Sequence, residues 1–137
     1  DIADDWPEVE VVVIPVGGGG LAAGTSLALR RTLGEQVRCL GAEPDGAPSM
    51  ALGIEAGKPV VLDSIDTQIQ GLCPPEAGEV VEPAGAAAVA AIREGHLDAW
   101  LEGRDADHPL RVVAVISGGN PAPDQLEQVR ASIAAES

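Results

Sequence analysis

The chain has 137 residues, of which 45% are hydrophobic, and it carries a formal net charge of −14. This length suits one domain with its own core, and the apolar content excludes a disordered acidic tail. The acidic balance disfavours nucleic-acid binding, because negative charge repels phosphate backbones. No apolar run is long enough to span a membrane, and the isolated cysteines Cys39 and Cys73 suit a reducing compartment. We therefore expect a cytoplasmic protein without nucleic-acid or membrane partners.

Apolar runs alternate with helical segments along the chain. Residues 9–16 are mostly Val and Ile, which is typical of a strand buried on both faces of a parallel sheet. We predict parallel strands at 11–16, 37–42 and 112–116, and helices at 21–33, 47–56, 84–94 and 124–135. Gly34, Gly57 and Gly95 follow three of these helices and are typical helix stops. This alternation predicts a three-layer α/β domain, with a mostly parallel sheet flanked by helices.

The strongest local motif joins the first strand to the first of these helices. It consists of Gly17, Gly18, Gly19 and Gly20, followed by Leu21. Glycines let the backbone approach a ligand closely, and N–H groups at the start of a helix suit a phosphate. The alternative is a plain strand-to-helix turn, but four glycines weaken both the strand and the helix. We therefore favour a phosphate site.

Two familiar phosphate-binding fingerprints fit this loop poorly. A P-loop is excluded, because no Lys-Ser or Lys-Thr follows the glycines. For a dinucleotide fingerprint, Gly18, Gly20 and Ala23 match only the variant with alanine at the third position, and Glu43 lies late for the ribose role.

Two further motifs lie later in the chain. Residues 82–86 read Glu-Pro-Ala-Gly-Ala, and residues 117–120 read Ser-Gly-Gly-Asn directly after the third predicted strand. Because α/β folds bind ligands at the carboxyl ends of parallel strands, such turns can converge on one cofactor.

The three motifs in this order, GGGGL, EPAGA and SGGN, resemble fold-type II pyridoxal-phosphate (PLP) enzymes. The similarity is to threonine dehydratase, serine dehydratase and serine racemase, and it spans nearly the whole chain. Residues 41–44, Gly-Ala-Glu-Pro, match the strand end that follows the glycine loop in that family. Gln70 stands where the family usually has Asp before a glycine, here Gly71. The resemblance implies a Rossmann-like PLP domain.

The resemblance also implies roles for individual residues. The loop Gly17–Gly20 and the N–H of Leu21 would hold the PLP phosphate, and Ser117 would hydrogen-bond the pyridine nitrogen. Glu82 would support the cofactor ring, and Gly71 would pass its backbone close to it. The implied reaction is β-elimination of small hydroxy amino acids to 2-oxo acids by an intact enzyme that is a homo-oligomer.

Related enzymes can carry a divalent cation near the strand end that holds Glu43. Glu43, the carbonyl of Ala47 and Ser49 would correspond to that Mg²⁺ or Ca²⁺ site, with Ser49 in place of a carboxylate. One carboxylate makes a poor site for either ion. The alternative role for Glu43 is a charge that flanks a helix.

The lysine that such enzymes join to PLP is missing from this sequence. The family carries it in an earlier segment with a Ser-x-Lys-x-Arg-Gly pattern, and no such pattern occurs here. Lys58, in a Gly-Lys-Pro turn, is predicted to be a solvated surface lysine. The helix and strand that the family has before the EPAGA motif are also missing, which predicts a deletion or gap near residues 80–81. We therefore predict that residues 1–137 form a single, partial PLP-binding domain that is inactive alone. The alternatives are a non-catalytic module for a phosphate-bearing ligand and another fold-type II activity, such as racemisation or β-replacement.

Overall fold

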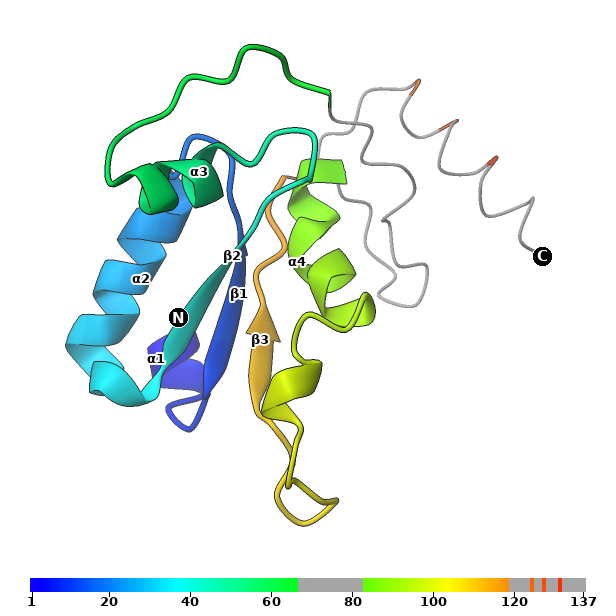
Figure 1. Cartoon of the computed structure of the whole chain (residues 1–137). Coiled ribbons are helices and arrows are strands. Elements are labelled where there is room, and N and C mark those ends of the chain that lie inside the picture. Colours follow the sequence, from blue (N-terminus) through cyan, green and yellow to red (C-terminus); the bar gives the residue numbers. More distant parts are fainter. Residues whose placement is uncertain (67–82, 119–123, 125–126, 128–130, 132–137) are drawn as a thin grey trace.

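The computed structural model describes residues 1–66, 83–118, 124, 127 and 131 (Figure 1). Its helices and strands, in chain order, are α1 (Ile2–Asp5), β1 (Val11–Pro15), α2 (Gly20–Leu33), η1 (Gly34–Gln36), β2 (Arg38–Ala42), α3 (Ser49–Ala56), α4 (Pro83–Arg93), η3 (Asp98–Trp100) and β3 (Val112–Ala114). The predicted helix at 124–135 and the predicted gap at 80–81 fall largely or wholly outside the described residues.

Three parallel strands form the sheet, in the order β2-β1-β3. Val11 of β1 pairs with Arg38 of β2 on one side and with Val112 of β3 on the other. The three predicted strands and their parallel direction are confirmed. β3 is shorter than predicted, because its pairing with β1 ends at Ala114.

β1 is the central strand and is buried on both faces. Val12 lies in one apolar cluster with Leu29 of α2, and Val13 lies in another with Ala88 of α4. Successive side chains of a strand point to opposite faces, so β1 serves both clusters. Full burial of each such valine contributes roughly 1.5–3 kcal/mol. Helices therefore cover both sides of the sheet, which confirms the predicted three-layer α/β fold (Figure 1).

Glycines end the helices where the sequence predicts. Gly34 has a φ of 77° and donates its N–H to the carbonyl of Arg30, and Gly57 has a φ of 64° and donates to the carbonyls of Gly53 and Ile54. Positive φ is a conformation that glycine adopts without steric cost. In α4, Ala86 and Ala88 are fully buried, so small side chains let this helix lie close to the sheet.

Three short helices, α1, η1 and η3, have no counterpart in the predictions. In α1, the side chain of Asp1 caps the helix by accepting a hydrogen bond of 3.1 Å from the N–H of Ala3. The other two are single turns, η1 at Gly34–Gln36 and η3 at Asp98–Trp100. None of the three is long enough to show a hydrophobic period. Among the described helices, none combines the length and the hydrophobicity needed to cross a bilayer.

An ionic clamp joins the segments that precede β1 and β3, at the amino-terminal ends of these two strands. The Glu10 carboxylate accepts from Arg104 Nη2 at 2.6 Å and from Arg111 Nε at 3.2 Å. Hydrogen bonding to the Arg104 side chain, and then to the Arg111 backbone, lowers the pKa of Glu10 from 4.5 to about 2. The clamp therefore holds the segment before β1 against the segment before β3.

Candidate functional site

A cavity of about 670 Å³ lies at the carboxyl ends of the three strands. We call it the strand-end cavity. Its walls are the glycine loop after β1, the loop between β2 and α3, the segment that follows α3, the first turn of α4 and Ser117, three residues beyond β3. The residues predicted from the sequence that line it are Gly17, Gly18, Gly19, Gly20, Leu21, Ala47, Ser49 and Ser117.

The topology of the sheet explains why the cavity lies there. From β1 the chain passes through α2 to β2 on one side, whereas β3 lies on the other side of β1. α2 and α4 pack on opposite faces, so the connections diverge beside the end of β1. Open α/β sheets bind ligands at such a switch point.

The tetraglycine loop forms one wall and has the properties of an anion cradle. Gly19 has a φ of 81° and is the N-cap of α2, where no side chain caps the helix. The N–H groups in the first turn of a helix have no partner within the helix, and they carry its positive dipole end. A Cβ on Gly17, Gly18 or Gly20 would meet no atom within 4 Å. The space in front of these three glycines is therefore open.

The two later motifs meet at another part of the cavity wall. A Cβ on Gly85 would overlap the carbonyl oxygen of Ser117, so the first turn of α4 passes directly against the backbone after β3. Ser117 is half-buried and lines the cavity together with Ala84 and Ala87 of α4. Gly71 and Glu82, the other two residues assigned to the cofactor, lie outside the described residues.

Glu43 directs its carboxylate to the start of α3. Its Oε1 accepts from the N–H of Met50 at 2.7 Å and from the Ser49 hydroxyl at 3.3 Å, and its Oε2 accepts from the N–H of Ala51 at 2.9 Å. The sequence leaves two roles open for Glu43, a metal ligand and a charge that flanks a helix. These hydrogen bonds correspond to the second role. Within the described ranges, no three His, Cys, Asp or Glu side chains are grouped to hold a metal ion. The donor set therefore does not fit a Mg²⁺ or Ca²⁺ site.

Some residues at the strand-end cavity were given no role by sequence reasoning. The segment 60–62 lines the cavity, as does Pro44, for which the Gly-Ala-Glu-Pro match implied no role. Met50 packs against the glycine loop, since its Cε lies 2.6 Å from where a Cβ on Gly19 would be. Residues 60–62 and Met50 belong to no motif, and a lone Met in a short helix gives no local signal of this contact.

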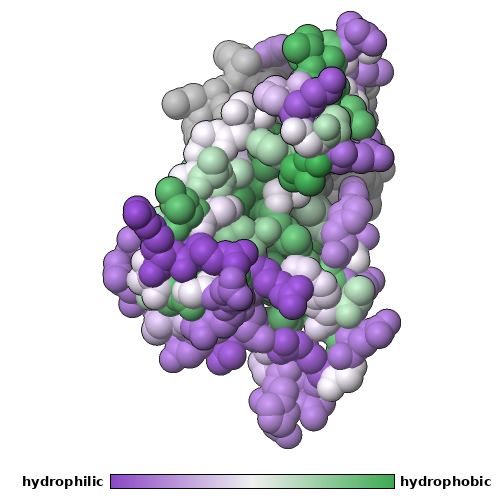
Figure 2. All heavy atoms as spheres, turned by 60° about the vertical axis from the view of Figure 1, so that its left-hand side comes forward, coloured by the Kyte–Doolittle hydropathy of each residue, from purple (hydrophilic) through white to green (hydrophobic). Residues whose placement is uncertain are grey.

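Exposed apolar side chains lie at this end of the molecule. Val61 and Ile65 line the strand-end cavity and are 92% and 73% exposed, and Ile54 of α3 is 75% exposed. Figure 2 shows apolar atoms in the upper and central part of one face, above a hydrophilic lower part. Lys58, the lysine in the turn after α3, is exposed and is not among the residues that line the cavity. This agrees with its prediction as a surface residue.

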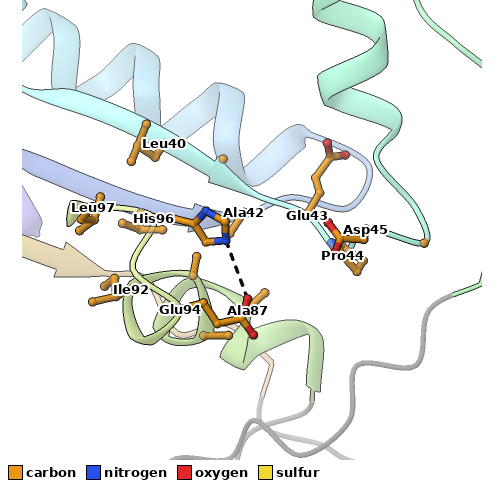
Figure 3. Close-up of a pocket in the computed structure, with 15 residues that line it drawn as sticks. Leu40, Ala42, Glu43, Pro44, Asp45, Ala87, Ile92, Glu94, His96 and Leu97 are labelled. Carbon is orange, nitrogen blue, oxygen red and sulfur yellow. Dashed lines mark ion pairs between the residues drawn. The ribbon is translucent and has the colours of Figure 1, made fainter. Parts of the chain in front are cut away.

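A second cavity, of about 870 Å³, lies between β2 and α4 (Figure 3). Leu40, Ala87 and Ile92 are among its apolar lining residues, whereas His96 and Glu94 form a pair at 3.8 Å on the helix side. Both of these side chains are about two-thirds exposed, at 67% and 69%. The cavity is larger than the strand-end cavity, but it contains neither the glycine loop nor Ser117. Volume alone therefore does not identify the candidate site.

Comparison with known proteins agrees with the geometry. The model of the family described as "Pyridoxal-phosphate dependent enzyme" matches residues 1–79. The L-threonine ammonia-lyase of Thermotoga maritima is 34% identical over 80 residues, which are 58% of this chain and 20% of that protein. The biosynthetic L-threonine dehydratase IlvA of Mycobacterium bovis is 44% identical over 82 residues, 59% of this chain and 19% of that protein.

The similarity extends to three dimensions. The structure of maize serine racemase superposes with a TM-score of 0.76 at 25% identity, covering 96% of this chain and 50% of that one. The chain spans about a fifth of the length of the curated relatives it matches. The family match covers more than half of the chain and includes the glycine loop. The maize serine racemase structure shares the arrangement of strands and helices. The chain therefore belongs to the family of pyridoxal-phosphate dependent enzymes.

Proposed function

We propose that this chain is the cofactor-binding part of a PLP-dependent enzyme of the threonine and serine dehydratase type. The observation that carries the proposal is the convergence of the glycine loop, the first turn of α4 and Ser117 on the strand-end cavity. Those three segments come from distant parts of the sequence and contain the motifs that resemble this family. The names of the similar proteins, a threonine ammonia-lyase and a threonine dehydratase, support the same reaction class.

Each segment would hold a different part of the cofactor. The N–H groups from Gly18 to Leu21 would donate to the phosphate, at the positive end of α2. The hydroxyl of Ser117, which also lines the cavity, would hydrogen-bond the ring nitrogen as a neutral partner. Gly71 and Glu82 would complete the surroundings of the ring. PLP, when bound, supplies an electron sink for carbanions, and a neutral partner at its nitrogen keeps the ring unprotonated.

The intact enzyme would convert a small hydroxy amino acid to a 2-oxo acid and ammonia. That reaction needs a lysine that links to the cofactor and moves the α-proton. Lys58 does not supply it, because it is exposed and lies outside the strand-end cavity. The lysine would therefore come from a segment that this sequence does not contain. The partial domain at 1–137, a cytoplasmic location and a homo-oligomeric intact enzyme stay predictions.

The exposure of Lys58 outside the cavity also favours a second candidate function. A chain that lacks the catalytic lysine can act as a non-catalytic module for a phosphate-bearing ligand. Both functions use the glycine loop, but only the first requires Ser117 to contact an aromatic ring.

A titration followed by NMR separates the two. We expect millimolar inorganic phosphate to shift the amides of Gly18 to Leu21, and PLP to shift the Ser117 amide as well. Gly20→Asp should abolish the loop shifts, because it places a carboxylate in the cradle; Gly24→Asp, one turn along α2, is the matched control with open space around it. Loop amides that stay unmoved in a folded chain would refute the phosphate site. Shifts with PLP that never reach Ser117 would favour the phosphate module.

A further inference from the structure

We infer that Glu43 is a positioning residue for the tetraglycine loop, which it orders through the first turn of α3 and without a divalent cation. The inference rests on the proposed function in one respect, that this loop binds the cofactor phosphate.

The first step is the contact of Glu43 with α3. The helix begins at Ser49, and its N-cap residue, Pro48, makes no side-chain hydrogen bond to it. The Glu43 carboxylate replaces that cap from the end of β2, and it accepts from the N–H groups of Met50 and Ala51 at 2.7 and 2.9 Å. A carboxylate at a helix N-terminus satisfies free donors and opposes the positive dipole end. The start of α3 is thereby fixed to the sheet.

The second step is the contact of α3 with the glycine loop. The Met50 side chain lies so close to Gly19 that a Cβ there would come within 2.6 Å of its Cε. Gly19 is also the residue whose φ of 81° turns the chain into α2. No atom lies within 4 Å of the Cβ positions of Gly17, Gly18 and Gly20. Met50 therefore packs against the loop at Gly19, and Glu43 holds the turn that carries Met50.

The third step concerns the cation that the family resemblance implies. Both oxygens of Glu43 already accept hydrogen bonds from α3, and Ser49 donates its hydroxyl to one of them. A hard cation of the Mg²⁺ or Ca²⁺ kind needs six or more oxygen ligands around it. Here the positive end of α3 neutralises Glu43 in place of an ion. The wall beside the glycine loop should therefore be ordered equally well with and without divalent cations.

The chain offers a direct probe of this contact, because Met50 is its only methionine. In a sample labelled at the methionine methyl carbon, one NMR signal reports the packing of Met50 against Gly19. We expect Glu43→Ala to move this signal towards its position in the unfolded chain and to shift the Gly19 amide. The dissociation constant for inorganic phosphate, from the Gly18 to Leu21 amides, should rise about fivefold, the effect of about 1 kcal/mol lost with a helix cap. Met50→Ala should weaken phosphate binding in the same direction.

Two variants separate positioning from general stability. Glu43→Gln keeps one carbonyl acceptor. Its Met50 methyl signal and its dissociation constant for phosphate should therefore lie between those of the wild type and Glu43→Ala. Glu55→Gln, on an exposed carboxylate near the other end of α3, should leave the methyl signal and the phosphate affinity unchanged. Preserved amide dispersion in β1 verifies that each variant is folded.

Three results would overturn the inference. The first is a Glu43→Ala chain whose Met50 methyl and Gly19 amide signals match the wild type. The second is a phosphate affinity within twofold of the wild type despite a displaced methyl signal. The third is a wild-type phosphate affinity that Mg²⁺ or Ca²⁺ raises in a way that Glu43→Ala abolishes. If the wild-type loop did not bind phosphate, the proposed function would fail. The Met50 methyl and Gly19 amide signals would still show whether Glu43 positions the loop.

Discussion

Replacing Glu10 by Gln tests the clamp that ties the segment before β1 to the segment before β3. The carboxylate accepts hydrogen bonds from both Nη atoms of Arg104, at 2.6 and 3.3 Å. It also accepts from the Nε and the backbone N–H of Arg111, at 3.2 Å each. Gln is nearly the same shape, but it has no charge and only one acceptor oxygen. Glu10→Gln therefore removes the ionic contribution while the packing around residue 10 stays nearly constant.

The magnitude follows from the pKa of Glu10, which falls from 4.5 to about 2 in the folded chain. At about 1.36 kcal/mol for each pKa unit, the upper limit is about 3.4 kcal/mol. The Glu10 and Arg104 side chains are 25% and 31% exposed, and Arg111 is 47% exposed, so water screens part of this attraction. We expect Glu10→Gln to lower the free energy of unfolding by about 1–2 kcal/mol at pH 7.

The sign of the pH dependence follows from the lowered pKa. Glu10 binds a proton less tightly in the folded chain than in the unfolded chain, so its stabilising contribution is complete above pH 4.5. As the pH falls from 4.5 towards 2, the unfolded chain takes up the proton first and the contribution is lost. The difference between the wild type and Glu10→Gln should accordingly shrink over this range.

Urea unfolding, followed by the fluorescence of the two tryptophans, measures this difference at pH 7, 4.5 and 3. Glu8→Gln is the matched control, because Glu8 is an exposed carboxylate two residues away. It should change the free energy of unfolding by less than about 0.5 kcal/mol. A Glu10→Gln chain as stable as the wild type at pH 7, or a difference that stays constant down to pH 3, would show that the clamp does not stabilise the fold.

The remaining predictions concern two glycines and the activity of the chain. Gly24 lies inside α2 with open space around its Cβ position, so Gly24→Ala should stabilise the chain by about 0.5–1 kcal/mol in urea unfolding; a loss of stability would contradict the helix there. Gly85→Ala should destabilise it by about 1–3 kcal/mol, because the new Cβ would overlap the Ser117 carbonyl oxygen; an unchanged urea midpoint would place α4 further from β3. The chain with added PLP should form no 2-oxo acid from serine or threonine in a coupled assay, because it lacks the catalytic lysine, and turnover that survives Lys58→Ala would disprove this.

Local sequence determined the elements and the class of fold. The run of Val and Ile at residues 11–14 predicts a strand buried on both faces, and β1 has that burial pattern. Gly34 and Gly57 predict the ends of α2 and α3, because a helix stop depends on a backbone conformation that one residue type favours. The order of the glycine-rich motifs was sufficient to indicate the family, since each motif is a short segment whose backbone must bend tightly.

Tertiary structure alone decided which of these elements meet. Nothing in the local pattern of β1 makes it the central strand, or places β3 on the side away from β2. Glu43 could be a metal ligand or a helix-flanking charge from the sequence, and the start of α3 gave it the second role. The contacts between Gly85 and Ser117 and between Met50 and Gly19 join residues more than thirty positions apart, as counted along the printed chain. Periodicity and propensity describe only neighbours along the chain, whereas such contacts depend on how the layers pack.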